Sequence, residues 1–345
     1  MFDFSDLEIP LVGAPMAGGP STPQLAAAVS NAGGLGMLAA GYLNAYQLAE
    51  QVKQTRELTD QPFGVNLFCP ADPNHNPTNA EALLQDYRQA LAPLGKQYGL
   101  DLLNDELVLP DHYGPLLDWL LANPVPVVTF TFGCPSAEDI AQLQAVGTCV
   151  GITVTNPQDA ALAAQPGANF LCVQGPNAGG HQSTFRVQDE VNQLPLSQLV
   201  PAVQAITDLP LVAGGGVGSN KDMRAILALG VEAVQVGTLL LLSDEAGTSQ
   251  AHRDALQSGI TETRLTRTFT GRPARAIINE FVAEFDALAP AVYPHMHYLT
   301  APLRAKAKDV GAWQHVNAWA GAGFSQAQTK PVRETISNLF KNYQT

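Results

Sequence analysis

One histidine stands in a setting that suits chemistry. The apolar run 170–174 stops at Gly175-Pro176, and a loop of small residues then leads to His181. An imidazole can accept a proton near neutral pH, and small neighbours leave it open to a ligand. We therefore take His181 as the candidate catalytic base. The alternative is an incidental histidine in a surface turn.

Two glycine-containing segments could hold a phosphate. Gly214-Gly215-Gly216 follows one apolar run, and Gln235-Val236-Gly237-Thr238 ends the next. Backbone N–H groups at such strand ends bind phosphate in many barrels, and a Cβ would hold the phosphate away from them. One glycine-rich turn alone could be purely structural. Two of them, one helix apart, favour a phosphate site.

Small and amide residues follow other apolar runs. Ala14-Pro15-Met16 follows the first run, Asn66 lies near the end of the third, and Gln174 ends the sixth. Asn and Gln each offer a donor and an acceptor, which suits a ring that presents both. With one phosphate site, this set describes FMN better than a simple sugar phosphate.

Apolar runs and amphipathic segments alternate over the first 245 residues. This pattern predicts an α/β protein, either a doubly wound sheet or a closed barrel, and eight strands favour a (β/α)₈ TIM barrel. Ser136 and Asn220 are expected to cap the helices that follow them. The expected strands are 11–14, 35–39, 63–67, 125–130, 149–154, 170–174, 211–213 and 233–236.

Two stretches interrupt the alternation. Residues 69–123 form an insertion after the third strand, and residues 246–300 follow the eighth. We expect about 246–300 to form a smaller, mostly helical lobe over the C-terminal mouth, on the substrate side. Residues 1–245 and about 301–345 would then form the barrel.

Charge and apolar content restrict the partners. The 18 basic and 31 acidic residues give a net charge of −13, which disfavours nucleic acid and anionic membrane surfaces. The most apolar stretch, 231–242, is too short to span a membrane, and no signal peptide is expected. Four widely spaced cysteines suggest buried thiols in a reducing cytoplasm and no metal site. We expect a cytoplasmic enzyme, monomeric or homodimeric.

Eight motifs run along nearly the whole chain: GAPMAGG (13–19), GVNLF (64–68), TFTFGCP (129–135), CVQGPNAGGH (172–181), AGGGV (213–217), VQVGT (234–238), TRTFTGRPAR (266–275) and YPHMHYLTAPLRAKA (293–307). In these motifs the chain resembles the class I nitronate monooxygenases. Single pieces are common among FMN barrels, whereas their order and spacing together are specific. The resemblance implies FMN, no nicotinamide requirement, and oxidation of alkyl nitronates such as propionate 3-nitronate by O₂ to carbonyl compounds and nitrite or nitrate.

The resemblance also implies roles for individual residues. His181 would be the base, and Thr131, Tyr293 and Tyr298 would contact substrate. Ser183 stands where family members usually have glycine, and Thr131 where some have a second histidine. The implied FMN contacts are Ala14, Pro15, Met16, Asn66, Gln174, Gly179, Gly180, Gly215, Gly216, Gln235, Val236, Gly237 and Thr238.

Other residues and other functions stay open. Arg272 and Arg275 would attract an anionic substrate or serve as salt-bridge partners, and His252 is expected on an exposed helix. The main alternative is an FMN-dependent enoyl-(acyl carrier protein) reductase using NAD(P)H, although an acidic chain fits an acidic carrier poorly. An isomerase or aldolase barrel would need a lysine or carboxylate at a strand end, and the strand ends offer none. A catalytically silent FMN-binding module is a further possibility.

Overall fold

The computed structural model describes residues 2–343, and its centre is a barrel of eight parallel strands. The strands pair in the order β1-β9-β8-β6-β5-β4-β3-β2. The ring closes where the Gly13 N–H donates to the Leu35 carbonyl at 2.9 Å and the Leu35 N–H donates to the Leu11 carbonyl at 2.8 Å. The strands are β1 (Leu11–Gly13), β2 (Gly36–Ala39), β3 (Phe63–Phe68), β4 (Val127–Thr131), β5 (Cys149–Val154), β6 (Phe170–Gln174), β8 (Leu211–Gly214) and β9 (Ala233–Val236).

The predicted strands are confirmed, each within two residues of its expected bounds. Each strand contributes one helix to the outer ring, α4 after β3 and α12 after β9, and contacts of α12 with α1 and α8 complete the ring. Ser136 caps α5 as expected, with the Asp139 N–H donating to its Oγ at 3.0 Å. The expected cap at Asn220 is wrong, because Ser219 holds that position and Asn220 is already helical. The helices are α1 (Pro23–Asn31), α2 (Ala45–Leu58), α4 (Tyr113–Ala122), α5 (Ala137–Ala145), α6 (Pro157–Ala164), α7 (Leu196–Gln204), α8 (Asn220–Leu227) and α12 (Val332–Leu339).

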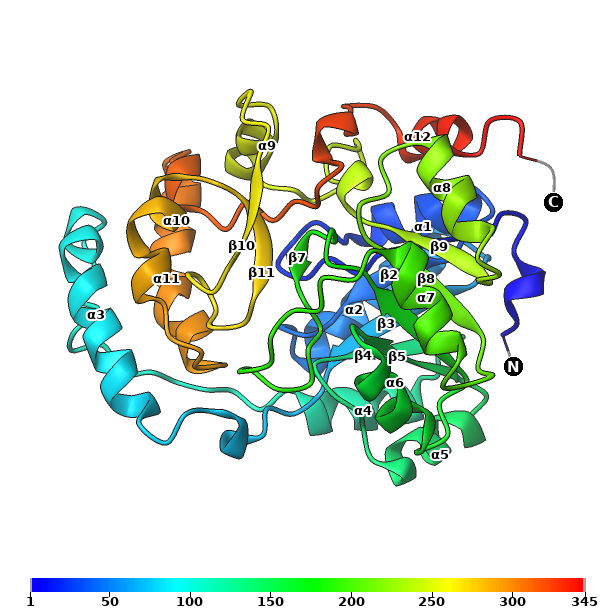
Figure 1. Ribbon diagram of the computed structural model, residues 1–345, viewed down its shortest axis with the longest axis horizontal. Coiled ribbons are helices and arrows are strands. Elements are labelled where there is room, and N and C mark those ends of the chain that lie inside the picture. The colour runs from blue at the N-terminus through cyan, green and yellow to red at the C-terminus, as the bar shows by residue number, and fades with distance from the viewer. Residues whose placement is uncertain (1, 344–345) are drawn as a thin grey trace.

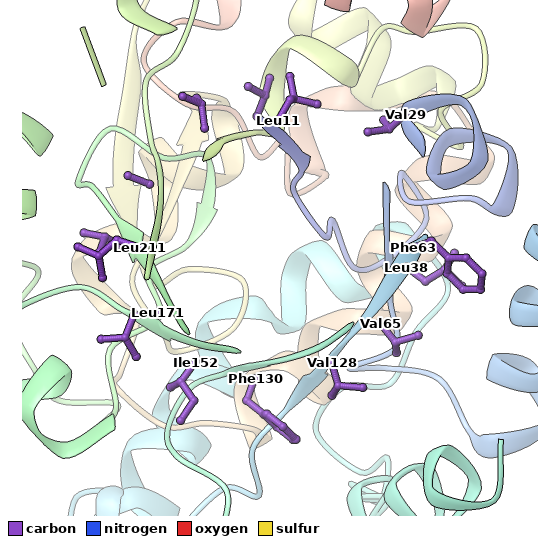
Figure 2. Packing of buried hydrophobic residues seen from close by; sticks show 14 of the residues in the cluster. Leu11, Val29, Leu38, Phe63, Val65, Val128, Phe130, Ile152, Leu171 and Leu211 are labelled. Atoms are coloured by element: carbon purple, nitrogen blue, oxygen red, sulfur yellow. The ribbon is translucent and has the colours of Figure 1, made fainter. Parts of the chain in front are cut away.

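Residues along each barrel strand alternate between two environments. On β4, Val128 and Phe130 pack outward against the helices, whereas Val127 points into the barrel. Strands buried on both faces explain why the sequence shows short, continuous apolar runs. Figure 2 shows the outward set, in which side chains of successive strands form a ring under the helices.

The bottom of the barrel is closed and apolar. Inward residues at the N-terminal ends of the strands, such as Val127 and Phe170, form a cluster onto which Phe2, Phe4 and Leu7 pack. Phe4 lies edge-on to Phe170 at 5.0 Å between ring centroids. Because the bottom is plugged, inward-facing polar residues can meet a ligand only at the C-terminal mouth.

A lobe covers that mouth (Figure 1). It contains helices and also a three-stranded antiparallel sheet, β10-β11-β7, which was not predicted from the sequence. Helix α3, from the insertion, shares an apolar core with α10 and α11. Within residues 2–343, no helix has both the length and the apolar character needed to cross a membrane. The lobe elements are α3 (Ala80–Gln97), β7 (Gly180–His181), α9 (Gln250–Leu256), β10 (Thr263–Thr266), β11 (Ala274–Ile277), α10 (Glu280–Phe285) and α11 (His295–Asp309).

Candidate active site

A cavity lies at the C-terminal ends of the barrel strands and collects most of the predicted site residues. His181, Thr131 and every residue predicted to contact FMN line it. Inward positions near the strand ends are polar, namely Asn66 on β3, Gln174 on β6 and Gln235 on β9. The inner face of the barrel therefore changes from apolar at the plug to polar at the mouth.

Glycine amides form one end of the cavity. Gly215 (φ +133°) and Gly216 (φ +82°) follow β8 in a conformation that side chains rarely adopt. A Cβ on Gly216 would stand 2.8 Å from Cβ of Asn177, so glycine is required there on space as well as conformation. The N–H groups of Gly215, Gly216 and Gly237 donate to no acceptor within residues 2–343. Unpaired amides that line a cavity suit a phosphate group.

Two backbone segments also pack closely against each other at the glycine end of the cavity. The Gly321 N–H donates to Oγ1 of Thr238 at 3.0 Å. A Cβ on Gly179 would stand 2.5 Å from the nitrogen of Gly321. Residues 177–180 and 320–323 therefore meet backbone to backbone, beside the short 3₁₀ helix η3 (Thr238–Leu240). The residues present thus fit a phosphorylated cofactor.

The two predicted amides have different surroundings. Asn66 is buried, and its Nδ2 donates to Oγ1 of Thr129 and to Oγ1 of Thr131, both at 3.0 Å. Its Oδ1 accepts no hydrogen bond from residues 2–343. Gln174 instead uses both ends of its amide within the protein. Its Nε2 donates to the His181 carbonyl at 2.9 Å, and its Oε1 accepts the Ser183 N–H at 2.8 Å. Gln174 thereby fixes the His181 loop.

His181 sits on the short strand β7, which pairs with β11 through Ala274. Its Nε2 lies 2.9 Å from Oγ1 of Thr270. The imidazole lies 5.5 Å from the ring of Phe132 and 5.2 Å from that of Trp319, between ring centroids. Sheet pairing and aromatic contacts thus hold the imidazole on the cavity wall.

Its environment keeps this imidazole neutral. Burial, followed by the nearby charges of Arg272 and Arg304, lowers the pKa of His181 to about 3. At physiological pH the ring therefore carries one proton and can accept another. The low pKa also makes it a weak base.

Two buried arginines flank His181 without a carboxylate partner in the described chain. Arg272 is 2% exposed, and its Nη1 donates to the Thr184 carbonyl at 2.8 Å. Arg304 is 8% exposed, and its Nη2 donates to the His297 carbonyl at 2.8 Å. Burial lowers the pKa of each guanidinium to about 10, so both remain cationic at neutral pH. Buried cations without a counter-charge favour an anionic ligand.

Comparison with known proteins agrees with this geometry. Residues 1–342 match the family described as nitronate monooxygenase. A probable nitronate monooxygenase of Staphylococcus aureus (strain Newman) is 34% identical over 345 residues, with 96% of this chain and 94% of that protein covered. The chain belongs to the nitronate monooxygenase family. The resemblance read from the motifs is confirmed, and the protein is an oxidoreductase of a family that generally depends on flavin.

Solved structures support the same assignment. A nitroalkane oxidase from Streptomyces ansochromogenes is 40% identical, with a TM-score of 0.90 and coverage of 97% of this chain and 95% of that one. FabK from Thermotoga maritima is 24% identical, with a TM-score of 0.74 and coverage of 98% and 93%. The second likeness shows the fold alone. The reductase alternative is therefore not favoured.

Some predicted residues lie away from the cavity of this nitronate monooxygenase family member. Tyr293 is buried one layer back, against Phe132, and Tyr298 lies edge-on to His297. Neither tyrosine lines the cavity. Arg275 does not line it either; its Nε donates to the Pro176 carbonyl at 2.9 Å.

The expected exposure of His252 is wrong. Its side chain is 7% exposed and lines the cavity, with Nε2 2.9 Å from the Trp319 carbonyl. Helix α9 packs under the segment 313–320, so the helix face that carries Ala251, His252 and Ala255 is buried. The sequence of α9, a short polar helix, does not indicate that another segment buries this face.

Two cavity residues on α11, Arg304 and Lys308, were not predicted from the sequence. His297, Arg304 and Lys308 line the cavity, and His297 stacks on Tyr42 with 4.1 Å between ring centroids. These three positions are spaced by seven and four residues, which places them on one face of a helix. Applying that period to residues 297–308 would have pointed to Arg304 and Lys308 and away from Tyr298.

Proposed function

We propose that this protein oxidises alkyl nitronates with O₂ and uses FMN to do so. The observation that carries the proposal is the buried Arg304, which lines the cavity with His181, together with Arg272 directly behind the cavity wall; no carboxylate neutralises either cation. A nitronate is a small planar anion, and such a pocket in a chain of net charge −13 would concentrate it. Propionate 3-nitronate, with two anionic groups, is the substrate we would test first.

FMN fits the opposite end of the cavity better than a larger dinucleotide does. The amides of Gly215, Gly216 and Gly237 would hold its single phosphate, and the free Oδ1 of Asn66 would accept from its ring. The chain has no second glycine-rich nucleotide fingerprint after a strand. When bound, FMN would supply the redox chemistry by taking electrons from the nitronate and passing them to O₂.

The protein's own groups would orient the substrate and control one proton. Arg304, held by Oγ1 of Thr300 at 3.1 Å, would fix the anion beside His181. The neutral imidazole would accept the α-proton of a nitroalkane, a step that a nitronate does not need. Because the pKa of His181 is low, we expect nitronates to be preferred to nitroalkanes. The lobe would exclude water from the substrate side.

Two measurements on the purified protein test this function. We expect a yellow protein whose released flavin is FMN and not FAD, and O₂ uptake with release of nitrite or nitrate on adding propionate 3-nitronate. Colourless protein that FMN does not reconstitute would overturn the cofactor. FMN-loaded protein that consumes no O₂ with any nitronate would overturn the reaction.

A further inference from the structure

A second cavity lies behind the active-site wall. Phe132 lines both cavities, whereas Arg272 and Phe185 line only the second. The ring of Phe132 is 4% exposed and stands between His181, at 5.5 Å, and the guanidinium carbon of Arg272, at 4.2 Å from the ring centre. A single aromatic ring therefore separates the space beside His181 from the space beside Arg272.

The backbone that carries this ring is in a restrained conformation. Phe132 has φ +74°, a region that residues with a side chain rarely adopt. Its N–H donates to Oγ of Ser183 at 3.0 Å. Ser183 is fully buried, and Gln174 holds it from the other side by accepting its N–H at 2.8 Å. A glycine at 183 would offer no hydroxyl, so this chain carries a clamp on Phe132 that a glycine cannot provide.

The second cavity offers room and one unused donor. Nε of Arg272 is buried and donates to nothing within the described chain. Phe185, Val187 and Cys134 line part of the remaining wall, and polar residues line the rest, including His75, Ser136, Asp72 and Asp139. A chain that passed the position of the Phe132 ring would therefore enter a partly apolar space and first meet the cation of Arg272.

We propose that Phe132, held by Ser183, sets the substrate size of this enzyme by closing the nitronate site beside His181. Phe132 is the specificity-determining wall, and Ser183 is a positioning residue that acts through it. The inference rests on the proposed nitronate oxidation. Removal of the ring joins the two cavities, admits longer nitronates, and brings an anionic tail within reach of Arg272.

The test compares chain-length profiles. Primary alkyl nitronates of increasing length, ending in either a methyl group or a carboxylate, are assayed with the wild type and with Phe132→Ala, Ser183→Ala and Phe185→Ala. The last is the matched control, because it enlarges only the second cavity. Straight-chain alkyl carboxylates, which mimic the planar anion and do not react, provide a second readout by calorimetric binding.

In the wild type, kcat/KM should fall by roughly 10-fold or more for each methylene beyond the length that reaches the ring. In Phe132→Ala, kcat/KM for nitronates and binding of carboxylates should both begin to fall only at longer chain lengths. The shift in chain length should be largest for carboxylate-ended chains. Ser183→Ala should shift this chain length in the same direction by a smaller amount, and Phe185→Ala should leave it unchanged. A profile unchanged in a folded Phe132→Ala and in Ser183→Ala overturns the proposal. Should Phe132→Ala not fold, the Ser183→Ala profile alone decides.

Failure of the inference is distinguishable from failure of the proposed function. If the wild type oxidises short nitronates but the variants keep its chain-length profile, the proposed function stands. The role of Phe132 as the specificity-determining wall is then rejected. A wild type that oxidises no nitronate rejects the function. The carboxylate-binding profiles then still decide whether Phe132 limits ligand length.

Discussion

At the scale of single residues, the site combines a neutral imidazole, which can accept a proton, with fixed cations, which can attract an anion. His181 has a pKa lowered to about 3, whereas Arg272 and Arg304 keep their charge. Attraction of the anion therefore falls to the arginines, and the histidine is left free to accept a proton. The predictions for these residues separate the two roles.

Replacement of His181 tests its role as a base. We expect His181→Asn to lower nitroalkane oxidation by roughly 10²–10⁴-fold, the usual contribution of a general base. Nitronate oxidation should suffer less, because that substrate arrives deprotonated. The wild-type nitroalkane rate should show no loss from this group until the pH falls toward 3. Rates are compared on a matched nitroalkane and nitronate at equal FMN content; equal losses on both would show that His181 only positions the ligand.

Replacement of Arg304 tests the anion site. We expect Arg304→Gln to raise KM for nitronates by roughly 10–100-fold, since a hydrogen bond to a charged group contributes about 1.5–3 kcal/mol. KM for a neutral nitroalkane should change little. Arg275→Gln is the matched control, because Arg275 lies outside the cavity. Equal KM changes for the charged and the neutral substrate would contradict the assignment.

At the scale of elements, local sequence patterns were enough to predict the barrel strands, whereas elements of the lobe depend on tertiary packing. The barrel strands were predictable because each is a buried apolar run, and most of them end at or next to a glycine or a polar residue. Strand β7 spans only Gly180–His181 and exists through its pairing with β11, 93 residues further along the chain, for which no local pattern is visible. The role of Arg304 was hidden for the same reason, since it depends on how α11 packs over the mouth.

The glycine cradle gives a prediction at this scale. We expect Gly216→Ala to weaken FMN binding strongly, because its Cβ would meet Asn177 at 2.8 Å in a loop that must present its amides. Gly147→Ala is the control for backbone strain alone. Gly147 has φ +92° and nothing within 4 Å of an added Cβ. FMN affinity is measured by fluorescence titration of the apoprotein. Equal affinity in the two variants would remove the phosphate site from residues 214–216.

At the scale of the whole molecule, charge is distributed unevenly. The chain carries −13 overall, yet cationic Arg304 and Lys308 line the cavity and Arg272 lies directly behind its wall. Buried neutral histidines accompany these cations, with the pKa of His252 lowered by burial to about 4. Because folding lowers the pKa of these histidines, the unfolded chain binds protons that the folded chain does not, and the free energy of unfolding depends on pH.

Acid should destabilise the protein partly through His252. Between its usual pKa of 6.5 and about 4, the unfolded chain binds a proton that the folded chain does not, so the free energy of unfolding falls as pH falls. Asp159, whose pKa burial raises to about 6, acts in the opposite direction. His252→Gln should lose less stability over this range, by up to about 1.4 kcal/mol per pH unit. Urea unfolding at several pH values checks this; parallel pH dependence in both proteins would contradict it.

If a nitronate is the electron donor, it should reduce the flavin in the absence of O₂, which an anaerobic titration measures. Purified FMN-loaded protein is mixed without O₂ with propionate 3-nitronate, and separately with NADH or NADPH, while the visible flavin absorbance is followed. We expect rapid bleaching by the nitronate and slow or no bleaching by either nicotinamide. Rapid bleaching by NADPH with turnover of an enoyl thioester, and none by nitronate, would contradict it.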